Sequence, residues 1–140
     1  MQQHNIDLFI QKAIEKTKKE KLSWKTLDNN FTVKPIPQDK AVISIPETYT
    51  LSTDLSFFSN FENGQILLLV YALPLMHFTP MPPSNCILTL RVQDDTSPFA
   101  VEISNTNDDL YNANTLLRLY NLISHHSNSI NTLINDFLNS

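Results

Sequence analysis

The sequence predicts an α+β domain in which an antiparallel sheet of four to five strands is packed on one face by an N-terminal helix and two C-terminal helices. Three observations lead to this prediction. Apolar residues recur with helical spacing at both ends of the chain, the centre holds alternating or continuous apolar runs, and short polar turns separate those runs. No helical pattern interrupts the central runs, so we expect the strands to form an antiparallel meander with the helices on one face.

The first helix is predicted over residues 5–19, where apolar residues follow the i, i+3, i+4, i+7 spacing of one buried face. Residues 22–27 then alternate apolar and polar side chains, as a strand does. A turn is expected at residues 28–30, followed by a short extended run at 31–33 and an irregular connection over 34–41 that contains two prolines.

The central strands are grouped around Gly64, which is the only glycine in the chain. The dipeptide Asn63-Gly64 lies between the runs 55–61 and 66–73, and predicts a tight hairpin with a type I′ turn and positive φ at both central positions. The scarcity of glycine excludes Gly-rich phosphate loops, dinucleotide-binding turns and the G-x-S-x-G nucleophile elbow.

Further strands are predicted at residues 86–93 and 99–103, separated by a turn at 94–98. The stretches 41–45 and 47–51 also have the composition of strands.

Two short helices are predicted at the C-terminal end. Residues 106–109 have the T-x-x-D pattern of a capping box, and the helix that follows ends at His125-His126. Its expected buried face holds Leu110, Ala113, Leu117 and Tyr120, widened by Leu116, Leu119 and Ile123. A last helix is expected over residues 130–137, with apolar positions at i, i+3, i+4 and i+7.

Length and composition predict one cytoplasmic domain spanning residues 1–140. Cys86 is the only cysteine, so the chain forms no internal disulfide and a reducing compartment is expected. The first residues lack the pattern of a signal peptide. The longest apolar run, residues 66–73, is far shorter than the ~20 residues that a membrane-spanning helix needs.

Charge is distributed unevenly along the chain. Residues 1–25 hold six of the ten basic side chains, whereas the whole chain carries a net charge of −4. This pattern suggests nucleic acid as a partner. Lysines near the end of a helix also complement the helix dipole, and that interpretation is preferred. Trp24, between Lys21 and Lys25, can stack on a base, but a tryptophan just beyond an amphipathic helix is more often part of the core.

The run 66–73 is apolar on both alternating faces, so both faces of this strand must be covered. We expect the cover to come from residues 74–83, from a second copy of the chain or from another partner. The segment 74–83 combines methionine and phenylalanine with four prolines, which suits an adaptable binding surface. The predicted partner surface consists of Leu75, Met76, His77, Phe78 and Met81.

Candidates for chemistry are sparse. Cys86 and His77 can form a thiol–imidazole pair, although the apolar neighbours of Cys86 favour an inert thiol. His125 and His126 point about 100° apart on a helix and do not jointly face one ion. His77 with Asp94 and Asp95 is a further conceivable metal site, without a defining spacing. The pairs Asp94-Asp95 and Asp108-Asp109 fit turns and helix starts better than acid–base catalysis.

The chain resembles small uncharacterised α+β proteins of low-GC Gram-positive bacteria. The residues that carry this resemblance are Lys21-Leu22-Ser23-Trp24-Lys25, the run 116–123 and the run 130–138. Such proteins often accompany mobile elements or toxin–immunity loci, so the resemblance implies a protein-binding role. It assigns no functional residues.

We therefore expect a non-enzymatic protein-binding or accessory module with no catalytic residue, cofactor or metal, and a homodimer is a compatible variant. The alternatives are a small-ligand binder or enzyme with its pocket between sheet and helices, and a factor that binds nucleic acid through Lys16–Lys25.

Overall fold

The computed structural model describes residues 3–28, 30–37, 45–73, 86–126, 134 and 137–139. Its elements in chain order are α1 (Gln3–Lys18), β1 (Trp24–Thr26), β2 (Thr50–Phe61), β3 (Gly64–Ala72), β4 (Cys86–Asp94), β5 (Val101–Asn105) and α2 (Ala113–His126). Residues 134 and 137–139 are also helical, within or next to the predicted last helix. Residues 41–44 of the predicted strand 41–45 lie outside the described part.

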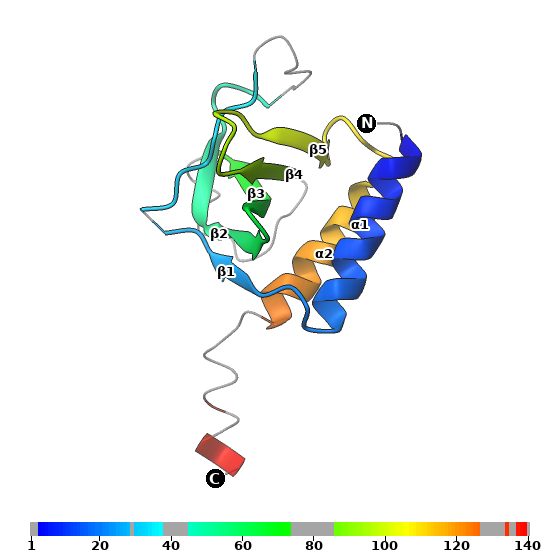
Figure 1. Cartoon of the computed structure of the whole chain (residues 1–140), viewed down its shortest axis with the longest axis vertical. Coiled ribbons are helices and arrows are strands. Elements are labelled where there is room, and N and C mark those ends of the chain that lie inside the picture. The colour runs from blue at the N-terminus through cyan, green and yellow to red at the C-terminus, as the bar shows by residue number, and fades with distance from the viewer. Residues whose placement is uncertain are drawn as a thin grey trace.

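The five strands form one antiparallel sheet in the order β1-β2-β3-β4-β5, so each strand pairs with its neighbours in sequence. This arrangement confirms the predicted meander. Helices α1 and α2 lie side by side on one face of the sheet, and both run from the β5 side toward the β1 side (Figure 1). None of the helices in the described ranges is long and apolar enough to cross a membrane.

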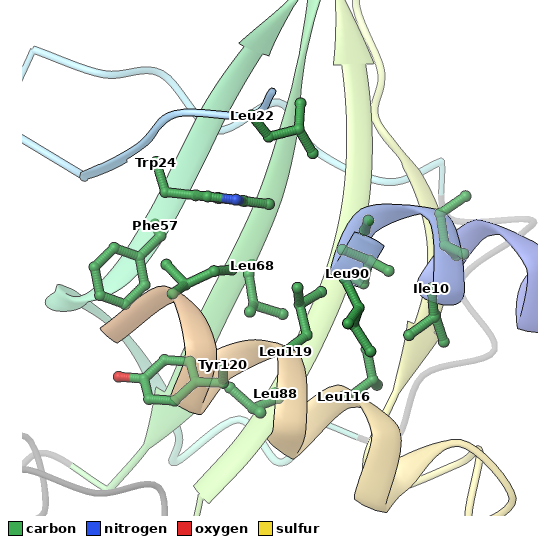
Figure 2. Close-up of a cluster of buried hydrophobic side chains, with 14 of the residues drawn as sticks. Ile10, Leu22, Trp24, Phe57, Leu68, Leu88, Leu90, Leu116, Leu119 and Tyr120 are labelled. Atoms are coloured by element: carbon green, nitrogen blue, oxygen red, sulfur yellow. The ribbon is translucent and has the colours of Figure 1, made fainter. Parts of the chain in front are cut away.

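The main core lies between the helices and the sheet. Leu68, Val70, Leu88 and Leu90 project from β3 and β4 and are at most 1% exposed. They pack against Ile10 of α1 and against Leu116, Leu119 and Tyr120 of α2, with Trp24 and Phe57 at one end (Figure 2). Burial of apolar area between the two layers is the main favourable free-energy contribution to this packing.

A second apolar cluster covers the opposite face of the sheet. Leu67 and Leu69 of β3 are fully buried there, together with Leu27. Phe31 and Val33 pack on this cluster, and the ring centroid of Phe31 lies 4.4 Å from that of Phe58. The chain that follows β1 therefore lies over the face away from the helices (Figure 1). We call residues 27–37 the cover segment, leaving residue 29 undescribed.

Hydrogen bonds fix the cover segment across the sheet. The side-chain amide of Gln93 on β4 donates to the carbonyl of Thr32 at 3.0 Å and accepts from the backbone N–H of Lys34 at 2.9 Å. Farther along, the N–H of Ala100 donates to the carbonyl of Pro35 at 2.9 Å. The segment thus crosses from the β1 edge to the start of β5. It covers the second face of β3. The predicted cover from residues 74–83 lies outside the described part.

The predicted turn at Asn63-Gly64 is wrong by one residue. Phe61 pairs with Gly64 at the end of the hairpin, so the two loop residues are Glu62 and Asn63. Glu62 has φ of 53°, whereas Gly64 has no positive φ and lies inside β3. Gly64 is needed for a different reason, because a Cβ atom there would lie 2.4 Å from the carbonyl oxygen of Gln93.

We expect Gly64→Ala to lower the free energy of unfolding by about 1–3 kcal/mol, because β3 and β4 must separate to accommodate the methyl group. Urea titration followed by the fluorescence of Trp24, the only tryptophan, measures this change. The matched control is Asn63→Ala in the exposed loop. Equal stability of Gly64→Ala and the native chain would contradict the close approach of β4.

Other boundaries also differ from expectation. Residues 31–33 form no strand, because their hydrogen bonds go to side chains and loops rather than to a neighbouring strand. The predicted runs 47–51 and 55–61 are largely one strand, β2, whose register shifts between Ser52 and Phe57. Inside this irregularity the Ser56 hydroxyl accepts from the N–H of Val70 at 2.8 Å and replaces a ladder hydrogen bond.

The start of α2 also departs from the predicted capping box. The Thr106 hydroxyl accepts from the N–H of Leu88 at 3.1 Å, so it does not cap a helix. Asp109 instead accepts from the N–H of Asn112 at 3.2 Å, and α2 begins at the next residue, Ala113. As a result Leu110 is 79% exposed and lies outside the buried face of α2, which is formed by Leu116, Leu119, Tyr120 and Ile123.

Candidate functional site

The surface predicted from the sequence is not part of the described structure. Leu75, Met76, His77, Phe78 and Met81 all lie outside the described residues. Their role as a partner surface stays a prediction, as does the pairing of His77 with Cys86 or with Asp94 and Asp95.

Cys86 itself begins β4 and is partly buried against the main core. Burial raises the pKa of the Cys86 thiol, because the thiolate loses hydration there. A thiol with a raised pKa carries less thiolate at neutral pH and is a weak nucleophile. The environment of Cys86 is therefore that of a packed thiol.

The paired carboxylates serve turns. Asp94 accepts from the N–H of Ser97 at 2.7 Å and from both the N–H and hydroxyl of Thr96, and these bonds hold the pKa of Asp94 below its usual range. Asp109 organises the start of α2 and also accepts from the Ser104 hydroxyl at 2.7 Å. Within the described ranges no three His, Cys, Asp or Glu side chains are grouped as metal ligands.

Trp24 is a core residue. It is 9% exposed, and its indole N–H donates to the Thr17 hydroxyl at 3.0 Å, which in turn donates to the carbonyl of Ala13 at 2.7 Å. The indole joins β1 to α1 and has no exposed face of the size that stacking on a nucleic-acid base needs.

An apolar groove lies between α1 and the hairpin end of the sheet. It has a volume of about 180 Å³, and its walls are almost entirely apolar. It is lined by Phe9, Lys12, Ala13 and Lys16 of α1, by Leu22, and by Phe61, Ile66 and Val92 of the sheet. We call this feature the α1 groove.

The groove follows from the way α1 crosses the sheet. The four α1 residues are spaced i, i+3, i+4, i+7 and form one stripe along the helix. Ile66 and Val92 are direct cross-strand partners on the face toward α1, and both are only partly buried. Phe61 pairs with Gly64, which has no side chain to cover it, and its ring is 46% exposed.

Positive charge lies on the α1 wall of the groove. The Lys16 ammonium is 5.9 Å from the centroid of the Phe61 ring. Lys12 is 3.9 Å from Glu15, but Glu15 is engaged more closely by Lys19 at 2.9 Å. Its hydrogen bond to Lys19 is the main reason why the pKa of Glu15 is lowered, with Lys12 contributing less.

Among the described residues that line the α1 groove, the ionisable ones are Lys12 and Lys16, and they lie beside apolar side chains. An apolar floor beside two ammonium groups suits a ligand that combines apolar side chains with a carboxylate.

Searches of protein-family models, curated proteins and solved structures find no match to the chain.

Sequence reasoning did not identify this groove. Phe61, Ile66 and Val92 have the pattern of ordinary strand residues, and Phe9 and Ala13 belong to the predicted buried face of the first helix. The only local signal was the pair of lysines beside that apolar face, at Lys12 and Lys16.

Proposed function

We propose that this chain is a non-enzymatic protein-binding module and that the α1 groove holds an amphipathic segment of its partner. The single observation behind this proposal is the combination of a carbon-lined groove with exposed Phe61 and the cationic wall of Lys12 and Lys16. Such a groove accepts apolar anchors spaced on one face of a helix, flanked by acidic side chains.

The size of the groove favours a peptide over a small-molecule ligand. About 180 Å³ is below the roughly 300–1,000 Å³ that is typical of small-molecule pockets. One or two side chains of a peptide fit such a volume, while the rest of the peptide lies on the surrounding surface. A surface of this type fits the protein-binding role that the resemblance implies. Trp24 is buried, so it does not offer the stacking face that nucleic-acid binding would use.

The test is a selection of short random peptides, displayed on phage, against the immobilised full chain. We expect enriched peptides to share apolar residues at helical spacing together with Asp or Glu, and to lose most of their retention on Phe61→Ser. Truncating a central aromatic anchor costs about 2 kcal/mol or more, which corresponds to roughly thirtyfold in affinity.

A matched control is available in Phe99→Ser, because Phe99 is 45% exposed but lies outside the groove. Peptides that bind the Phe61→Ser and Phe99→Ser proteins equally well would place binding elsewhere. A selection without any enriched peptide that depends on Phe61 would also contradict the proposal.

A further inference from the structure

The apolar floor of the α1 groove continues across the sheet toward its β5 edge. Ile66 pairs with Val92, and Val92 pairs with Val101, so these three side chains lie next to one another on the face toward the helices. Val101 is 61% exposed. At the β2 end the direct partner of Ile66 is the small Ser59, and the exposed ring of Phe61 follows two residues later on the same face. We call Phe61, Ile66, Val92 and Val101 the apolar row.

A second hollow borders the apolar row on the side of the β2–β3 hairpin. It has a volume of about 260 Å³ and shares Phe61, Ile66 and Val92 with the α1 groove. Its lining also includes the carboxylate residues Glu62 and Asp94, and none of the described residues that line it is basic. The row therefore has ammonium groups on its α1 side and carboxylates on its hairpin side.

Glu62 is the main source of negative charge on the hairpin side. It is exposed in the two-residue loop of the hairpin, directly after Phe61. Asp94 contributes less, because its carboxylate is engaged in the turn to Ser97 and because the Lys34 ammonium, which donates to the carbonyls of Asp94 and Ser97, lies close to it. Opposite charges on the two sides of an apolar strip favour a ligand with the reverse arrangement.

The spacing of the apolar row suits a helix. Neighbouring strands lie about 4.8 Å apart and one helical turn rises about 5.4 Å, so apolar side chains one turn apart meet successive strands. Helix α1 crosses the strands on the same face, from the β5 side toward the β1 side (Figure 1). A helix along the row thus lies beside α1, and about three turns reach from Phe61 on β2 to Val101 on β5.

We propose that the partner segment is an amphipathic helix of another protein that lies along the apolar row, with acidic side chains toward α1 and basic side chains toward Glu62. This inference rests on the proposed function, because the α1 groove is one side of the surface. It goes further in fixing the charge on both flanks of the partner helix and in extending the contact to Val101, outside the groove. A helix with acidic residues on both flanks makes a repulsive contact with Glu62, so the two-sided charge selects among helices of similar hydrophobicity.

Three synthetic helical peptides test this charge pattern. They share leucine at heptad positions a and d and one staple on the opposite face, and they differ only in the flanking columns e and g. One carries glutamate in one column and lysine in the other, the second carries glutamate in both, and the third carries lysine in both. By fluorescence anisotropy with nanomolar labelled peptide, we expect the glutamate–lysine peptide to bind the native chain at least about threefold more tightly than either of the others.

Charge reversal at the hairpin should change the order of these affinities. In Glu62→Lys, we expect the peptide with glutamate in both columns to bind more tightly than the glutamate–lysine peptide. The matched control is Glu20→Lys, because Glu20 is also an exposed glutamate with positive φ, 59° against 53° for Glu62, but lines neither hollow. Glu20→Lys should leave the order of the native chain unchanged.

The β5 end of the apolar row is tested by Val101→Thr, which keeps the β-branched shape of the side chain and replaces one methyl group by a hydroxyl group. We expect this variant to bind the glutamate–lysine peptide about threefold more weakly than the native chain, because one apolar contact is lost.

The outcomes separate this inference from the proposed function. Equal or tighter binding of the peptide with glutamate in both columns to the native chain, an unchanged order in Glu62→Lys, or an unchanged affinity in Val101→Thr would overturn the inference while leaving the α1 groove as a binding surface. If binding of all three peptides is absent, or survives Phe61→Ser, both proposals are overturned. A dimer of the free chain that sedimentation detects and Phe61→Ser abolishes would assign the apolar row to a second copy and overturn the inference.

Discussion

Replacing Glu102 by Ala is expected to lower the free energy of unfolding by about 3 kcal/mol, because it leaves the guanidinium of Arg91 buried without its counter-ion. The side chains of Arg91 and Glu102 are only 8% and 15% exposed, and Nε of Arg91 lies 3.6 Å from Oε2 of Glu102. Thr89 connects them, since its hydroxyl donates to Glu102 at 2.7 Å and accepts from Arg91 at 3.3 Å. Arg91 also donates to the hydroxyl of Tyr71 at 3.3 Å.

Two controls separate burial from charge in this experiment. Glu15→Ala removes a carboxylate from an exposed pair with Lys19, and should change stability by less than about 0.5 kcal/mol. The double variant Arg91→Met/Glu102→Leu removes both charges and should be more stable than Glu102→Ala alone. Urea unfolding monitored by Trp24 fluorescence measures the free energy of unfolding of all three variants. A loss below about 1 kcal/mol for Glu102→Ala would show that solvent reaches the pair.

The second large effect is expected from Leu69→Ala, which should lower the free energy of unfolding by about 2–5 kcal/mol. Leu69 is fully buried on the face of β3 that points away from the helices, beneath the cover segment. Leu69→Ala should lower the free energy of unfolding as much as Leu68→Ala does on the helix face, because Leu68 is equally buried. Leu8, which is 50% exposed, provides the control in Leu8→Ala.

Denaturant unfolding of the three proteins decides between two arrangements. If the cover segment fills the second face, Leu69→Ala and Leu68→Ala lose similar stability and Leu8→Ala loses little. If the second face of β3 were instead exposed in the isolated chain and covered only by a partner, Leu69→Ala would lose as little stability as Leu8→Ala.

The elements with local patterns were predictable from the sequence. Alternation identifies β4, the continuous apolar run identifies β3, and the helical spacing of apolar residues identifies α1. Because these elements have polar turns between them and no intervening helix, the meander order and the helices on one face follow from general packing rules. Their ends differ by two or three residues, as at α2, where Asp109 rather than Thr106 sets the start.

The features that depend on distant contacts were not predictable. Phe31 and Val33 have no periodic pattern, so nothing local shows that they cover Leu67 and Leu69 on β3. The need for glycine at position 64 comes from the carbonyl of Gln93, far along the chain, and not from the turn.

The α1 groove belongs to the same class of feature. It exists because α1 crosses the sheet without covering Phe61, Ile66 and Val92 completely. No single segment of the sequence encodes this relation, since the helix and the strands each show an ordinary amphipathic pattern. Sequence reasoning instead placed the partner surface at residues 75–78 and 81, which stays a prediction.

The central claim is that the α1 groove binds apolar segments that carry acidic residues, and the affinity of a Phe61-dependent peptide for two charge-reversal variants tests it most directly. Lys16→Glu and Lys18→Glu change the net charge equally and lie on the same helix, but only Lys16 lines the groove. By isothermal titration calorimetry, Lys16→Glu should weaken binding about tenfold, and Lys18→Glu should leave it nearly unchanged. Equal effects of the two substitutions, or no effect of either, would contradict the claim.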